Sequence, residues 1–219
     1  MWKWFDLVGI DKSKTHEHEI PDGDRAHYSK RTIDFEFEYP FGQKELYGLA
    51  YRTDYDLKKH QEFSGLDLSY KDQETGSSFI PHVIEPTWGV DRTILAVLLS
   101  AFDDSDPKRV VLKLEPAIAP YKVAVFPLVA NKPEIFDNAR GIYLNLKKEF
   151  PVIWDARGNI GKRYYAQDEI GTPWCVTIDY DTLKEKTVTV RDRDTTKQDR
   201  VSVESLQSYF SQKLKEDNS

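Results

Sequence analysis

Residues 83–102 read VIEPTWGVDRTILAVLLSAF, and this stretch decides how the first half of the chain is predicted to fold. A short apolar run ends in Glu85, four turn-forming residues follow, and the segment from Ile94 to Phe102 is almost wholly apolar. We predict a strand, a tight turn and a helix capped by Asp91, because a carboxylate satisfies the free N–H groups of a helix start. A helix that is apolar on all sides is expected to be buried.

This junction has two interpretations. In the first it is a small-molecule site, because the buried helix would hold a carboxylate (Glu85), a flexible residue (Gly89) and a cation (Arg92) on a rigid base. In the second it is an ordinary strand, turn and helix whose two charges face solvent, since short motifs also match by chance. The residues by themselves leave both open.

Two alternating segments precede the junction and predict strands. Residues 32–39 alternate between apolar and acidic side chains, which places three carboxylates on one face. These are Asp34, Glu36 and Glu38, and they face either water or a cationic or ammonium ligand. Residues 44–51 predict a second strand with Glu45, Tyr47 and Leu49 on one face and with Gly48 leaving room for a ligand or a backbone. Residues 32–102 therefore predict an antiparallel meander closed by a buried helix.

After a proline-bracketed linker at residues 115–120, strands alternate with helices. The predicted helix from Pro133 to about Phe150 carries an apolar stripe at Ile135, Ala139, Ile142 and Leu146. Strands are predicted at 122–128, 152–154, 174–179 and 187–191, and helices at 162–170 and 203–215. This order favours an α/β domain with a mixed sheet. We therefore predict two domains, 1–115 and 116–219.

Composition excludes several classes of protein. A net charge of −6 argues against indiscriminate nucleic-acid binding, although local basic patches still allow RNA to bind. The single cysteine, Cys175, excludes an internal disulfide and a cysteine-cluster zinc site, and we expect no zinc. The longest apolar run is too short to cross a bilayer, and the first residues do not form a signal peptide. We therefore expect a cytoplasmic protein without a membrane partner.

Basic and aromatic residues near Gly158 are candidates for RNA contact. Arg157, Lys162 and Arg163 lie at a glycine-opened helix start, where anions bind favourably, and Tyr164 and Tyr165 offer stacking faces. An ordinary solvated helix end is the alternative. The segment is not a nucleotide-binding P-loop, because the four-residue gap and the Ser or Thr after lysine are missing.

Three other groups favour plain structural roles. His16-Glu17-His18-Glu19 lacks the spacing of a helical zinc site and predicts a solvated loop. Interleaved aspartates make the basic residues between 191 and 200 more typical of surface ion pairs than of RNA binding; these are Arg191, Arg193, Lys197 and Arg200. Cys175, among apolar neighbours, predicts an inert core thiol.

Three separated segments resemble one family, in the order that the family has them. Residues 85–92, EPTWGVDR, resemble motif 3 of the class II aminoacyl-tRNA synthetases in the form found in glycyl-tRNA synthetases. Residues 41–57, FGQKELYGLAYRTDYDL, resemble that family's signature before motif 3. Residues 188–195, VTVRDRDT, resemble its anticodon-binding domain. The resemblance implies the antiparallel-sheet portion of a class II synthetase core (α+β), followed by an α/β anticodon-binding domain with a mixed sheet.

The resemblance also implies a function and a set of site residues. The function is ATP-dependent attachment of glycine to its tRNA. Arg92 would contact ATP and Glu45 would hold Mg²⁺, both as catalytic residues; the full ATP set is Glu45, Leu46, Gly89, Val90, Asp91 and Arg92. Glu85 would pair with the ammonium of glycine, and Trp88 would wall the pocket; the full glycine set is Glu85, Pro86, Thr87, Trp88 and Gly89. Thr87 stands where the family usually has serine. The complete enzyme would be a homodimer.

The chain departs from the family pattern in one large respect. Motif 1, which builds the dimer interface, and motif 2, which supplies an arginine for the α-phosphate, are not found before residue 32. We therefore expect the chain to be the C-terminal part of a glycyl-tRNA synthetase, with little or no activation activity by itself. Two alternatives stay open: a non-catalytic RNA-binding accessory protein built from the same modules, and another class IIa synthetase of the prolyl, threonyl or histidyl type.

Overall fold

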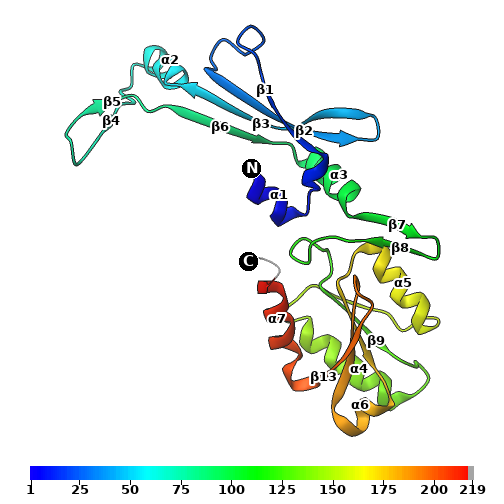
Figure 1. Cartoon of the computed structure of the whole chain (residues 1–219). Helices are drawn as coiled ribbons and strands as arrows, with labels where there is room; N and C mark the ends of the chain where they lie inside the picture. Colours follow the sequence, from blue (N-terminus) through cyan, green and yellow to red (C-terminus); the bar gives the residue numbers. More distant parts are fainter. Residues whose placement is uncertain (217–219) are drawn as a thin grey trace. The chain divides into compact units, whose positions relative to one another are not determined.

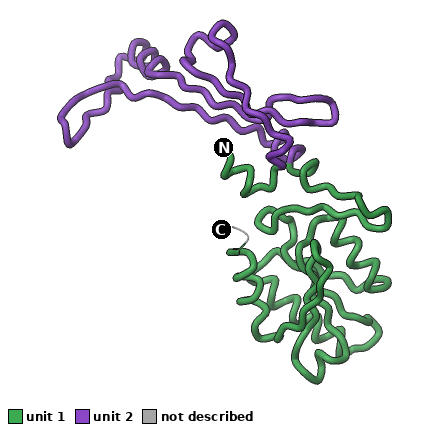
Figure 2. Tube along the Cα trace, viewed as in Figure 1, with its two compact units in different colours: residues 1–10, 97–219 green, residues 11–96 purple. Residues whose placement is uncertain are grey.

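The computed structural model describes residues 1–216, which form two compact units. Figure 2 colours them separately: one contains residues 11–96, and the other contains residues 1–10 together with the chain from Val97 onward. The division between Ala96 and Val97 lies within a helix, whereas the sequence predicts domains that meet at 115/116. Each unit is described separately below, with the labels of Figure 1.

The unit of residues 11–96 is built on a four-stranded antiparallel sheet of order β1-β2-β3-β6. Its strands are β1 (Thr15–Glu19), β2 (Arg31–Tyr39), β3 (Gly42–Thr53) and β6 (Val83–Trp88). The predicted meander is thereby confirmed, with Phe35, Phe37 and Tyr39 buried on one face of β2. Smaller elements of this unit are η1 (Lys12–Lys14), α2 (Tyr55–Ser64), β4 (Tyr70–Lys71) and β5 (Ser78–Phe79).

Two segments of this unit that were predicted as a loop and a turn are mainly strand. The segment His16 to Glu19 is not a loop, because it pairs along its length with β2 as strand β1. The predicted turn at residues 86–89 is mostly strand, because β6 continues to Trp88 and pairs with β3. Cross-strand hydrogen bonding overrides the local turn preference of a proline that lies on an edge strand.

A β-bulge in β3 changes the predicted alternation of its side chains. Phe35 pairs with Tyr47 but the next residue, Glu36, pairs with Glu45, so Leu46 is the extra residue. Leu46 and Tyr47 are both buried, and Glu45 lies on the face opposite to Tyr47. The prediction that Glu45 and Tyr47 share a face is therefore wrong, because a bulge shifts the alternation by one residue.

Helix α3 (Val90–Ala101) follows β6 directly. Asp91 lies in its first turn rather than at the cap position, where its charge still suits the helix dipole. Ala96, Val97 and Ala101 are buried, but the exposed fractions of Ile94 and Leu98 are 54% and 41%. All-round burial of this helix, as predicted, is therefore wrong for the residues that the structure describes.

The other unit contains a five-stranded mixed sheet of order β10-β9-β11-β12-β13. β9 is parallel to β10 and β11, whereas β12 and β13 are antiparallel to their neighbours. The strands are β9 (Val123–Pro127), β10 (Val152–Trp154), β11 (Trp174–Ile178), β12 (Thr187–Asp192) and β13 (Gln198–Ser202). The predicted mixed sheet is confirmed, although β13 was not foreseen as a strand.

Helices cover both faces of this sheet and close two clusters of buried residues. Helix α4 (Pro133–Leu146) buries Ile135, Ala139, Ile142 and Leu146, which are the four residues of the predicted stripe. Helix α5 (Ile160–Ile170) packs Ile160 and Tyr164 against the opposite face. The unit also contains α1 (Trp2–Val8), β7 (Phe102–Asp106), β8 (Arg109–Leu112), α6 (Tyr180–Glu185), η2 (Val203–Ser205) and α7 (Leu206–Glu216).

Candidate functional site

The four-stranded sheet has one face rich in carboxylates, which we call the acidic face. The register places Asp34, Gly48 and Thr87 side by side across β2, β3 and β6, and it places Glu85 opposite Ala50 in the next row. The bulge in β3 brings a further carboxylate, that of Glu45, to this face. The acidic face is defined by Asp34, Glu36, Glu45 and Glu85. Four carboxylates on one surface favour a cationic or ammonium ligand.

Gly48 lies between two of these carboxylates. A Cβ atom at this position would lie 3.8 Å from Asp34 Oδ1 and 3.8 Å from Glu45 Oε1. The absence of a side chain keeps the space between the two groups open. Burial, and then the negative charges of Glu45 and Glu36, raise the pKa of Asp34. The protein thus holds these carboxylates close together although their negative charges repel one another, and a bound cation would reduce that repulsion.

Glu85 is held by a cation from the strand beside it. Arg52 Nη1 donates a hydrogen bond to Glu85 Oε2, while Arg52 Nε and Nη2 each donate to Asp56 at 2.7 Å. The guanidinium also lies 4.0 Å from the ring centroid of Tyr28. This arrangement orients the Glu85 carboxylate, whose side chain keeps an exposed fraction of 45%. Sequence reasoning missed Arg52 as the partner of Glu85, and Asp56 as the second carboxylate that Arg52 binds.

Arg92 and Glu45 lie together, although 47 residues separate them in the sequence. Arg92 Nη1 donates to the carbonyl oxygen of Glu45 at 2.8 Å and lies 3.4 Å from Glu45 Oε2. Thr93, the next residue, donates to the carbonyl of Gly89 at 2.7 Å and bonds to the hydroxyl of the buried Tyr47. Tyr47 thus anchors the first turn of α3, and the turn places Arg92 beside the acidic face.

Some predicted site residues do not reach the acidic face. Trp88 pairs with Tyr47 and packs edge-on against its ring, with centroids 6.2 Å apart, so it lies on the face opposite to Thr87. Pro86 lies on that opposite face too, and the side chain of Leu46 is buried. Trp88 therefore does not wall the same surface as Glu85, because side chains alternate along β6. Val90 and Asp91 lie exposed in the first turn of α3.

The predicted RNA candidates at α5 separate into two kinds. The Arg163 side chain is buried, with a residue exposure of 2%, and donates to the backbone carbonyls of Pro127 and Leu128. It is a structural residue, and its prediction as an RNA contact is wrong. Arg157 is 94% exposed and Lys162 is exposed too, so both still present charge to solvent. Asn159 caps this helix and accepts from Lys162 N–H at 2.9 Å.

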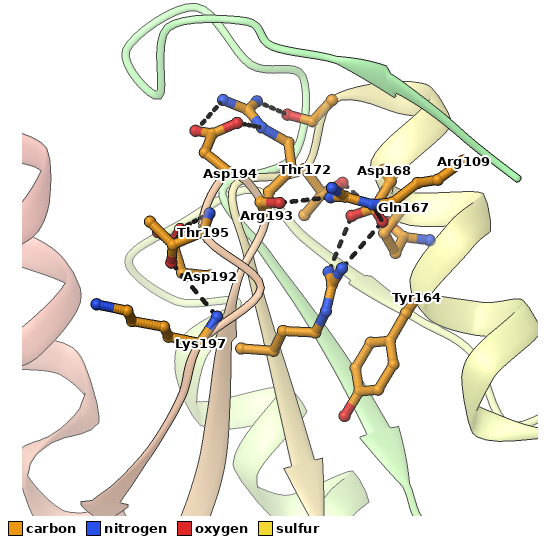
Figure 3. A network of polar contacts seen from close by, with 12 residues as sticks. Arg109, Tyr164, Gln167, Asp168, Thr172, Asp192, Arg193, Asp194, Thr195 and Lys197 are labelled. Carbon is orange, nitrogen blue, oxygen red and sulfur yellow. Dashed lines mark hydrogen bonds and ion pairs between the residues drawn. The ribbon is translucent and has the colours of Figure 1, made fainter. Parts of the chain in front are cut away.

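Figure 3 shows a polar network that sequence reasoning placed at the surface. Asp168 is fully buried and binds both Arg191 and Arg109. Arg193 is also buried; it donates to the carbonyl of Gly171 and to Asp194. Arg191 and Arg193 do form ion pairs, as predicted, but both guanidinium groups are buried: Asp168 on α5 supplies the counter-charge of Arg191, and Asp194 supplies that of Arg193.

Residues 122–213 match the family model described as "Anticodon binding domain". The chain is 47% identical to a glycine–tRNA ligase of Caldanaerobacter subterraneus subsp. tengcongensis over 97% of its own length and 46% of that protein. The chain is related to the glycine–tRNA ligases. Identity to the glycine–tRNA ligase of Thermobifida fusca is also 47%, over 97% of the chain and 48% of the relative. The chain thus spans about half the length of the curated relatives that it matches.

This kinship covers both units of the structure. The family model falls within the mixed-sheet unit, and the similarity to glycine–tRNA ligases extends over almost all of the chain. Within residues 1–216, no three His, Cys, Asp or Glu side chains are close enough to form a metal-binding cluster. No helix in that described part is long and apolar enough to cross a membrane.

Proposed function

We propose that the chain carries part of the glycine and ATP site, together with the tRNA anticodon-binding domain, of a glycine–tRNA ligase. The observation that carries the proposal is the match of residues 122–213 to the anticodon-binding model within a chain related to glycine–tRNA ligases over 97% of its length. In the other unit, the carboxylates of the acidic face are suited to the ammonium of glycine, and the guanidinium of Arg92 is suited to the phosphates of ATP.

Amino-acid activation depends on positioning and on positive charge at the ATP phosphates more than on an acid or a base. Arg92 is partly exposed and its guanidinium is fixed by the carbonyl oxygen of Glu45, so a cation is ready to contact a phosphate. Glu85, oriented by Arg52, is the carboxylate for the ammonium of glycine, and Thr87 adds a hydroxyl on the same face.

The residues present fit a magnesium ion that is bound mainly through ATP. Mg²⁺ usually takes one or two protein carboxylates together with substrate phosphates and water. Glu45 and Asp34 approach each other across Gly48 and offer such a pair of oxygen donors. The ion would neutralise phosphate charge when bound. Glu45 therefore has two roles in the proposal, since its backbone carbonyl fixes Arg92 and its carboxylate faces the ion.

The test is binding of the whole chain to glycine tRNA, in competition with a version whose anticodon is substituted, at one fixed salt concentration. We expect preference for the native anticodon. Equal binding of the two tRNAs, with the same salt dependence, would contradict anticodon recognition. Glycine-dependent ATP–pyrophosphate exchange, measured in parallel, reports whether this part of the site activates glycine by itself.

A further inference from the structure

Arg52 lies at an irregularity in the pairing of β3 with β6. The register shifts between Tyr51 and Thr53, so Arg52 is an extra residue opposite β6, and Thr53 has a left-handed backbone with φ of 54°. A bulge re-aims the side chain of the extra residue. The guanidinium of Arg52 reaches both Glu85 on β6 and Asp56 in the first turn of α2. The end of β3 thus joins the acidic face to the start of a helix.

Two carboxylates share this guanidinium unequally. Both oxygens of Asp56 accept from Arg52, one from Nε and the other from Nη2, at 2.7 Å each, which is the strong two-pronged geometry of an arginine and a carboxylate. Glu85 accepts one hydrogen bond, from Nη1 to Oε2, and within residues 1–216 no hydrogen bond reaches its Oε1. The Glu85 side chain is 45% exposed, whereas that of Asp56 is 21% exposed. One oxygen of Glu85 is therefore open to a ligand.

Aromatic rings support the guanidinium from the side. Its central carbon lies 4.0 Å from the ring centroid of Tyr28, and the Arg52 side chain is only 19% exposed. The ring of Tyr55 lies 6.4 Å from that of Tyr28, and His27 Nε2 lies within hydrogen-bond distance of the Tyr55 hydroxyl, at 3.1 Å. Because the guanidinium is stacked and mostly shielded from water, its charge acts on Glu85 with less screening than a free surface charge would.

The balance of these three charges decides what Glu85 can attract. One positive charge lies between two carboxylates, so the group as a whole keeps a single negative charge. The hydrogen bonds from Arg52 lower the pKa of Asp56, which keeps that carboxylate ionised at neutral pH. If Asp56 carried no charge, Arg52 would neutralise Glu85, and the attraction of Glu85 for an ammonium group would be largely cancelled.

We propose that Asp56 is a positioning residue of the glycine site: acting through Arg52, it supplies the counter-charge that leaves Glu85 its negative charge and one free oxygen for a primary ammonium. The inference rests on the proposed function in one respect, since Glu85 is taken there as the carboxylate for the ammonium of glycine. Asp56 lies outside the predicted glycine and ATP sets. Its contribution comes from charge balance, because its own oxygens are both occupied by Arg52.

The test is a double-mutant cycle in which glycine binding to the whole chain is measured by calorimetry, on variants that circular dichroism shows to be folded. Asp56→Asn leaves Arg52 to Glu85 alone, and we expect the affinity for glycine to fall at least about tenfold. Arg52→Gln/Asp56→Asn removes two opposite charges, and we expect the affinity to return to within about threefold of the parent. Rescue by the second substitution separates charge balance from packing, because losses of packing add to one another.

One control variant and one control ligand accompany the cycle. Glu62→Gln removes a carboxylate from an exposed ion pair elsewhere on α2, that of Lys59 with Glu62, and should leave glycine affinity within about twofold of the parent. Glycolate, in which a hydroxyl replaces the ammonium of glycine, is titrated in parallel. Asp56→Asn should not weaken glycolate binding, since glycolate has no positive charge for Glu85 to attract.

The outcomes separate this inference from the proposed function. If Glu85→Gln abolished glycine binding but Asp56→Asn did not weaken it, or if the double variant bound no better than Asp56→Asn, the inference would be overturned and the role of Glu85 would stand. If the parent did not bind glycine, or if Glu85→Gln bound it as the parent does, both the role of Glu85 and the inference would be overturned. Anticodon preference, measured separately, would still support the tRNA-binding part of the proposed function.

Discussion

Asp168 on α5 accepts two hydrogen bonds from the guanidinium of Arg191 on β12, at 2.9 and 3.0 Å. The same carboxylate accepts from Arg109 Nε on β8 at 2.8 Å, and none of Asp168 is exposed to solvent. One buried carboxylate therefore joins a helix, the central sheet and the β7–β8 hairpin. Because two guanidinium groups share it, its loss would leave the buried Arg191 and the partly buried Arg109 without this counter-charge.

We expect Asp168→Asn to lower the free energy of unfolding by about 3–5 kcal/mol, because removing one partner of a buried ion pair leaves the other uncompensated. Chemical denaturation followed by circular dichroism measures the change. Glu62→Gln is the control, since the side chains of Glu62 and its partner Lys59 are 60% and 45% exposed and their pair is expected to contribute about 1 kcal/mol or less. Equal losses in the two variants would show that the buried carboxylate has no special role.

Gly171 lies at the end of α5 in a left-handed conformation, with φ of 81°. A Cβ atom there would lie 2.9 Å from the carbonyl oxygen of Leu112 and 2.9 Å from Leu114 Cδ1, so alanine adds a clash to the backbone strain. We expect Gly171→Ala to destabilise the chain by about 3 kcal/mol, measured as the shift in thermal unfolding.

Gly158→Ala provides the comparison for that prediction. Gly158 has a similar φ of 64°, but a Cβ atom would meet nothing within 4 Å. Only the cost of the left-handed backbone remains, about 1 kcal/mol. If both variants lost the same stability, close packing of α5 on β8 would not be the reason for glycine at residue 171.

The regular parts of the fold could be predicted because local pattern and tertiary packing agree there. The helical spacing of Ile135, Ala139, Ile142 and Leu146 reports burial directly, and the four residues are the buried face of α4. The bulge at Leu46 could not be predicted, because it depends on pairing with β2 and reverses the face of Glu45. Nor could the exposure of Ile94, since apolar composition does not say which neighbours are present.

The candidate site was predictable only in outline. The sequence predicted that Arg92, Glu45 and Glu85 matter together, and the structure places Arg92 against Glu45. The face on which Trp88 lies could not be predicted, because it depends on strand β6 continuing as far as Trp88.

Cys175 is expected to be unreactive in the folded chain. It is fully buried in β11, and burial raises the pKa of its thiol well above the ordinary value. Since the thiolate is the reactive form, we expect a thiol reagent such as a disulfide dye to label native protein at least about a hundredfold more slowly than urea-unfolded protein. The measurement is absorbance of the released dye with time. Rapid labelling of native protein would contradict the burial of this strand.

Asp34 is expected to lower the stability of the fold at neutral pH. Burial, and then the charges of Glu45 and Glu36, raise its pKa in the folded state above the ordinary 3.8. The folded state therefore holds this proton more tightly than the unfolded chain does, and stability falls as the pH rises from 3.8 through the raised pKa. We expect Asp34→Asn to be more stable than the parent at pH 7, with the difference shrinking below pH 4.

Asp56→Asn is the control with the opposite sign. The hydrogen bonds from Arg52 lower the pKa of Asp56, so its contribution to stability is present above pH 3.8 and is lost as the pH falls through the lowered value. We expect this variant to be less stable than the parent at pH 7 and to approach it in acid. Unfolding free energies of both variants between pH 3 and pH 8 check the pair. If Asp34→Asn destabilised the chain at neutral pH, the carboxylates of the acidic face would not repel one another, and a bound cation would not be needed to relieve them.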